Sequence, residues 1–69
     1  MFLHRYELQS SHAGVPWLVI AIYADSDAEA IDNVAAVAQQ AIEGGAVDLA
    51  LFEIGLGTER LIQRYEVTR

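Results

Sequence analysis

Serine and histidine, which serve as nucleophile and base in many hydrolases, occur together in one short segment, Ser10-Ser11-His12. A serine hydroxyl becomes a nucleophile when an imidazole within hydrogen-bond reach takes its proton and a third group orients that imidazole. Adjacent residues in a short turn rarely meet that geometry, and SSHAG, residues 10–14, has the composition of a turn. We therefore interpret the segment as a polar hairpin turn. His4 is expected to be a partly buried strand residue rather than a catalyst.

Three carboxylates, Asp25, Asp27 and Glu29, have the spacing of the first ligands of a calcium loop. The twelve-residue loop also requires Gly at its sixth position and a distal Glu, and both are missing here. Ser26 with Glu29 fits a helix capping box instead, and the acidic residues suit the positive end of a helix dipole. We interpret the group as the start of a helix. Without Cys, a zinc site is not expected either, and no cofactor is implied.

A glycine-rich segment, GLGTE at residues 55–59, is the last candidate for chemistry, as a phosphate-binding loop. Such loops lead into the N-terminus of a helix, where free N–H groups bind anions. A strand pattern follows this segment, which therefore predicts a hairpin turn. With no catalytic constellation in the sequence, we predict that the protein is not an enzyme.

Hydrophobic periodicity predicts a single α+β domain over residues 1–69, with the element order ββαββ. Residues 2–9 alternate as a half-buried strand, and Pro16 opens a second strand over 17–24. The helix is expected over 25–45, with a glycine pair at its end. The remaining strands are expected at residues 47–55 and 60–69.

The expected sheet has four strands in the order 1-2-3-4, with the helix packed on one face. The second and third strands have the continuous apolar runs of central strands, whereas the first and fourth carry Arg and Glu, as guarded edge strands do. The order 2-1-4-3 places the apolar strands outside and is the poorer fit. Each strand's faces follow from alternation, which groups Leu61, Tyr65 and Val67 on one face of the last strand.

The apolar run from Trp17 to Ala24, eight residues long, leaves one sheet face without an obvious cover. One helix covers one face, so we expect the opposite face to be an interface. The alternative is that edge-strand side chains and chain ends fold over it. A chain of this size buries only about 60% of its unfolded surface, which favours a homodimer. The expected aromatic anchors are Trp17, Tyr23, Phe52 and Tyr65.

The charge distribution points to a protein partner with a basic surface. The net charge is −6, and the interval between Arg5 and Arg60 has no Lys or Arg. An acidic surface repels phosphate backbones, so direct nucleic-acid binding is not expected, although the surface could mimic a nucleic acid. The carboxylates expected to contribute are those of the helix and its start, Asp25, Asp27, Glu29, Asp32 and Glu43.

Neither a signal peptide nor a membrane-spanning run is recognisable, so a cytoplasmic location without membrane contact is expected. Residues 23–42 form a strand end followed by a capped Ala-rich helix, a recurrent piece of small ββαββ proteins. The overall architecture resembles several small phage-encoded inhibitor proteins, including some anti-CRISPR proteins. The resemblance implies a cofactor-free inhibitor that binds a host nucleic-acid-processing complex, and it transfers no functional residue.

A second hypothesis is a small oligomeric ligand-binding protein or enzyme, with Trp17 and Tyr23 lining a site between subunits and His4 or His12 acting in catalysis. A third is a structural subunit of a larger particle.

Overall fold

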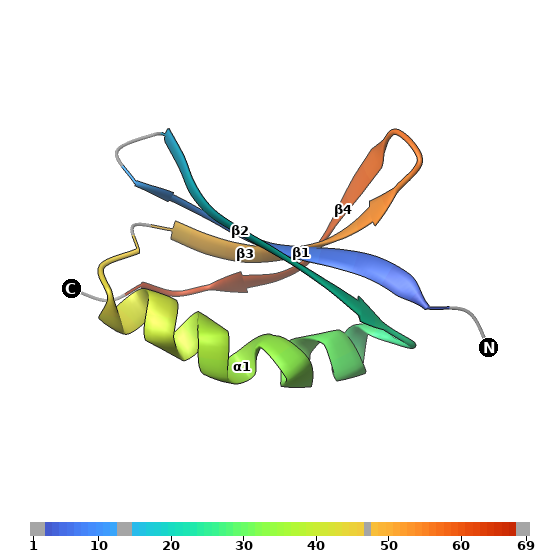
Figure 1. Ribbon diagram of the computed structural model, residues 1–69, viewed down its shortest axis with the longest axis horizontal. Helices are drawn as coiled ribbons and strands as arrows, with labels where there is room; N and C mark the ends of the chain where they lie inside the picture. Colours follow the sequence, from blue (N-terminus) through green and yellow to red (C-terminus); the bar gives the residue numbers. More distant parts are fainter. Residues whose placement is uncertain (1–2, 13–14, 47, 68–69) are drawn as a thin grey trace.

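The computed structural model shows a four-stranded sheet with a single helix lying along one face (Figure 1). It describes residues 3–12, 15–46 and 48–67, and within these the side chains of all residues except 11, 12 and 15–18. The elements follow the chain as β1 (His4–His12), β2 (Val15–Ala24), α1 (Asp27–Glu43), β3 (Asp48–Gly55) and β4 (Thr58–Tyr65). The predicted α+β class is confirmed.

Helix α1 begins and ends at the signals that the sequence carries. The hydroxyl of Ser26 accepts a hydrogen bond from the backbone N–H of Glu29 at 3.2 Å, which confirms the predicted N-cap. Gly44 is the C-cap, and Gly45 has a φ of 102°, a conformation that side chains other than hydrogen disfavour. The helix is therefore shorter by two residues at each end than the predicted segment 25–45.

The strand order is β2-β1-β3-β4, with every neighbouring pair antiparallel, so the predicted order 1-2-3-4 is wrong. Strand β1 lies inside the sheet although it carries Arg5 and Glu7. Its polar residues alternate with Tyr6 and Leu8, which are buried beneath the helix. A sheet covered on one side allows a central strand to keep one polar face, so charge on β1 does not mark an edge.

The two apolar strands, β2 and β3, are separated by β1. Both are antiparallel to β1 and therefore run in the same direction, as expected for a strand–helix–strand unit. The helix crosses the sheet between them and contacts all four strands. The consequence is that β2, the most apolar strand of the chain, lies at the edge of the sheet.

The core lies between α1 and the sheet. The fully buried large side chains of the sheet are those of Tyr6 and Leu8 on β1 and of Leu49 and Leu51 on β3. The helix contributes small residues, Ala30, Val34 and Ala38. Because these side chains are short, the helix packs closely on the sheet. No helix in the described part of the chain is long and apolar enough to cross a bilayer.

Two irregularities overturn local predictions. Leu51 pairs with Gln63 and Phe52 with Leu61, so Ile62 is an extra residue in β4. Ile62 and Tyr65 consequently pack together against the core, and the predicted grouping of Leu61 with Tyr65 is wrong. The expected turn over residues 10–14 is also too long, since β1 continues to His12; residues 13 and 14 lie outside the described part.

Candidate functional site

The sheet face opposite α1, here called the open face, is not covered by another element in the described part of the chain. Its centre is a polar row on β1, formed by Arg5, Glu7 and Gln9. Each of these residues has one neighbour on β2 and one on β3, because β1 pairs with both strands. The side chains of Tyr6 and Leu8 point to the helix instead, so those of the polar row point away from it.

Apolar side chains flank the polar row on both sides. On β2 they form the β2 band, Val19, Ala21 and Tyr23, which pair with Gln9, Glu7 and Arg5. On the other side they form the β3–β4 band, Ala50, Phe52, Ile54 and Leu61. Val19 is 56% exposed, Tyr23 58% and Leu61 45%, which is unusual for large apolar side chains that share one face.

Hydrogen bonds hold the polar row in place. Arg5 Nη2 donates to Glu7 Oε2 at 3.2 Å, and Gln9 Nε2 donates to Glu7 Oε1 at 3.0 Å. The same Gln9 amide lies 3.2 Å from Glu59 Oε2 of β4. These groups remain accessible to water, so the row can exchange its exposed hydrogen bonds for those of a partner with little desolvation cost.

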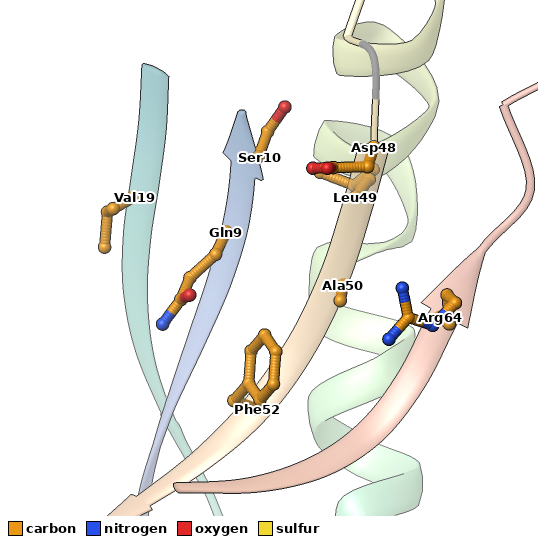
Figure 2. Close-up of a pocket in the computed structure, with 8 residues that line it drawn as sticks. All are labelled: Gln9, Ser10, Val19, Asp48, Leu49, Ala50, Phe52 and Arg64. Carbon is orange, nitrogen blue, oxygen red and sulfur yellow. The ribbon is translucent and has the colours of Figure 1, made fainter. Parts of the chain in front are cut away.

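The open face is hollowed at one end. Figure 2 shows Val19, Gln9, Phe52 and Arg64 around a cavity of about 280 Å³, with Ala50 at its centre. Ser10, Asp48 and Leu49 complete the lining. The Arg64 guanidinium extends toward β3, and within the described residues it has no ion pair or hydrogen bond. The cavity combines apolar walls with the Arg64 guanidinium and the Asp48 carboxylate, and its volume lies just below the usual range of small-molecule pockets.

A second polar group lies on the helix side, where α1 begins. The Tyr6 hydroxyl donates to Asp27 Oδ1 at 2.9 Å. Arg60 Nη2 is 3.1 Å and 3.2 Å from the two Asp27 oxygens, and Arg60 Nε donates to Glu53 Oε1 at 2.9 Å. His4 Nδ1 lies 3.1 Å from Glu53 Oε2. We call these five residues the Tyr6 cluster.

The contacts within the Tyr6 cluster explain its ionisation behaviour. Burial, the hydrogen bond to Asp27 and the nearby carboxylates raise the pKa of Tyr6 to about 12. The hydrogen bond from Tyr6 and the Arg60 guanidinium lower the pKa of Asp27, and Glu53 and Asp27 raise that of Arg60. Each charged group thus already has its partner inside the cluster. This arrangement fixes the helix start to the sheet.

In the parts of the chain that the structure describes, no three His, Asp or Glu side chains are grouped so as to hold a metal ion.

Comparison with known proteins adds no assignment. No family model, no curated protein and no solved structure matches the chain. The role of the open face therefore has to be argued from its own residues.

The structure brings only part of the predicted site together. Tyr23 and Phe52 lie on the open face, on opposite sides of the polar row. Tyr65 does not lie there: it packs against the core, where burial raises its pKa and its hydroxyl has no hydrogen-bond partner among the described residues. The side chains of Trp17 and His12 lie outside the described part.

Four of the five carboxylates predicted to form the acidic surface are exposed to solvent. They are Asp25, directly before α1, and Glu29, Asp32 and Glu43 on α1. Asp27 is occupied by Tyr6 and Arg60. The polar row and Arg64 were not among the predicted site residues. Strict alternation along β1 is the signal that could have placed Arg5, Glu7 and Gln9 on an uncovered face.

Proposed function

We propose that the chain is a non-enzymatic protein-binding module and that its binding surface is the open face. The observation that supports this proposal is the pair of apolar bands, with Val19, Tyr23 and Leu61 each close to half exposed or more. Large exposed apolar side chains gathered on one face mark protein-binding sites. The polar row between the bands supplies hydrogen-bonding groups that orient a partner, as polar groups do within interfaces.

The proposed partner has a basic surface. The exposed carboxylates of α1 and the net charge of −6 favour such a partner through long-range attraction. The architecture's resemblance to phage-encoded inhibitors suggests the concrete form: a cytoplasmic inhibitor of a nucleic-acid-processing complex, with the acidic helix in the place of a phosphate backbone. This form predicts that the chain slows cleavage by a nucleic-acid-guided nuclease in vitro.

A matched pair of leucines tests the open face. Leu61 lies on it, whereas Leu56 is fully exposed in the turn between β3 and β4. The immobilised chain is used to capture a partner from cell lysate, and the affinity of the purified partner is then measured by calorimetry. We expect Leu61→Asp to weaken binding at least tenfold and Leu56→Asp to change it less than twofold. Equal affinities for the two variants, or no partner for the wild type, would contradict the proposal.

A charge-reversal pair tests the acidic surface separately. Asp32→Lys with Glu43→Lys should weaken binding of the same partner and flatten its dependence on salt, because fewer ion pairs are screened. Unchanged affinity at low and high salt would remove the acidic helix from the interface while leaving the open face in place.

The cavity beside Arg64 supports one alternative, a site for a small anionic ligand with an apolar body. Among the described residues the Arg64 guanidinium has no ion pair, and its position next to Phe52 and Val19 suits a carboxylate attached to an apolar group. A thermal-shift screen of small carboxylic acids tests this alternative. A rise of several degrees that Arg64→Gln abolishes would favour it over the protein-binding proposal.

A further inference from the structure

The two edges of the sheet differ in how they are protected against pairing. Strand β4 carries Glu59, Arg60 and Arg64 and is interrupted by the bulge at Ile62. Charges and bulges are the usual devices that keep an edge strand from adding a neighbour. Strand β2 has no charged residue from Val15 to Ala24. Its Pro16 and the irregular pairing opposite Ser10 and Ser11 affect its first residues only, so the segment from Val19 onward has no such protection.

The unprotected part of β2 is apolar on both faces. Val19, Ala21 and Tyr23 are exposed on the open face. Ile20 and Ile22 lie on the helix side, where they pack against the core and remain partly accessible. A strand that pairs with this edge must therefore offer apolar side chains on both of its faces. Within the described sheet, β2 has a neighbour on one side only, since β1 follows it and nothing precedes it.

We propose that a second copy of this chain occupies this edge, with the two β2 strands antiparallel and the two-fold axis passing beside Ala21. This pairing places Val19 opposite Tyr23 of the second copy on the open face, and Ile20 opposite Ile22 on the helix side. Aromatic side chains next to β-branched ones are favourable cross-strand pairs. The two sheets then form one continuous eight-stranded sheet, and the edge that favours uncontrolled pairing is removed.

Charge explains why two chains of net charge −6 can meet here and why they must be antiparallel. The carboxylates near the seam are Glu7, which lies one strand away opposite Ala21 and is paired with Arg5, and Asp25, directly after β2. In the antiparallel arrangement the two Asp25 residues are eight positions apart along the strands, or about 27 Å. Charges at that distance are screened at physiological salt, where the Debye length is about 8 Å. A parallel arrangement would bring the two carboxylates close together, and it does not have two-fold symmetry.

Ala21 permits a direct test because it is small, exposed and placed at the proposed axis. Lysine at this position puts two like charges directly opposite one another in the dimer, whereas in the monomer it lies on the water-exposed open face beside Glu7. Ala36, which is exposed on α1, gives the matched control. The masses of the wild type, Ala21→Lys and Ala36→Lys are measured by light scattering over a hundredfold range of concentration. Circular dichroism verifies that each variant is folded.

We expect the wild type and Ala36→Lys to have twice the chain mass of 7.6 kDa. The Ala21→Lys dimer should dissociate into monomers at protein concentrations at least tenfold higher than the wild-type dimer does. A wild type that is monomeric throughout would overturn the proposal and would assign the edge to a strand of another protein. A dimer that Ala21→Lys leaves intact would also overturn it, because the seam would then lie elsewhere.

A cysteine variant tests the register without added charge. The chain contains no Cys, so Ala21→Cys introduces the only thiol. Directly opposite residues of an antiparallel pair have Cα atoms about 4.5–5.5 Å apart, within the range that a disulfide bridges. We expect Ala21→Cys to form a disulfide-linked dimer under mild oxidation much faster than Ala36→Cys. Equal rates would contradict the register. This result is independent of the open-face test, since Leu61 lies on β4, at the opposite edge.

Discussion

The Tyr6 phenol should resist ionisation until well above the pH at which a free phenol loses its proton. Its pKa of about 12 compares with 10.0 for an unperturbed phenol. At pH 11 about one tenth of Tyr6 is then ionised, against about nine tenths of a free phenol. The difference in absorbance at 295 nm between the wild type and Tyr6→Phe isolates this one group. A difference signal with a midpoint near pH 10 would show that burial and the Asp27 hydrogen bond do not act on Tyr6 as argued.

The same shift predicts how stability changes in alkali. Because the folded-state pKa lies above the unfolded-state value, the neutral phenol contributes stability that is complete below pH 10 and is lost as the pH rises through about 12. The shift corresponds to about 2.7 kcal/mol at most. Asp27 is 44% exposed, and water screens part of its effect on Tyr6. We therefore expect the free energy of unfolding of the wild type, measured in urea, to fall by about 1 to 2 kcal/mol more than that of Tyr6→Phe over this range.

The variant Asp27→Asn separates the effect of the Asp27 carboxylate on the Tyr6 pKa from the effect of burial. It removes the charge next to Tyr6 and keeps an acceptor, so the Tyr6 pKa should decrease but remain above 10, because burial is the largest cause of its shift. The variant should also lose the acid dependence that Asp27 confers. That dependence arises because a lowered carboxylate pKa gives stability above its ordinary value of 3.8 that is lost as the pH falls through the folded-state pKa. An unchanged titration of Tyr6 would contradict the role given to Asp27.

Three substitutions test the packing of the fold, each through urea unfolding followed by circular dichroism at one fixed protein concentration. Leu51→Ala should cost about 3 kcal/mol because Leu51 is completely buried, and a cost below 1 kcal/mol would contradict its place in the core. Ser26→Ala should cost about 1 kcal/mol through the lost N-cap, and an unchanged stability would mean that the cap is not needed. Ser10→Ala should be neutral within about 0.5 kcal/mol or stabilising, since the buried hydroxyl has no hydrogen-bond partner among the described residues; a large loss would reveal a partner.

Local signals in the sequence were sufficient for the elements and not for their arrangement. The capping box and the glycine pair located α1, alternation located the first and last strands, and apolar runs located the second and third. The strand order was wrong because charge on β1 was taken as protection of an edge. In this sheet the same charges form the polar row of the open face, with β1 between β2 and β3. Alternation reports how many faces of a strand are covered, and it does not report how many neighbours the strand has.

The prediction of site residues was limited for the same reason, because alternation along a strand does not report which strands lie beside it. Tyr23 and Phe52 were chosen as aromatic anchors, and the structure places both on the open face, although the sequence did not determine which face of β2 meets the helix. Tyr65 was misplaced because one extra residue, Ile62, reverses the alternation in the middle of β4, and no residue type marks that bulge in advance. The Tyr6 cluster was not predicted at all. It joins Tyr6, Asp27 and Arg60 across separations of 21 and 33 positions, which depend on a strand order that the pattern did not determine.

The central position of β1 also sets a constraint on how the chain folds. Strands β1 and β2 are joined by a hairpin and can pair early, but β1 finds its second neighbour only when β3 arrives. Arg5 pairs with Ile54, for example, far along the chain. Loops of that length close slowly, and sheets that depend on them fold more slowly than local ones. Until β3 docks, the β1–β2 hairpin exposes an unpaired edge on each side. A β1–β2 hairpin without β3 has the unpaired edges that favour aggregation, so the docking of β3 protects the chain as well as completing the sheet.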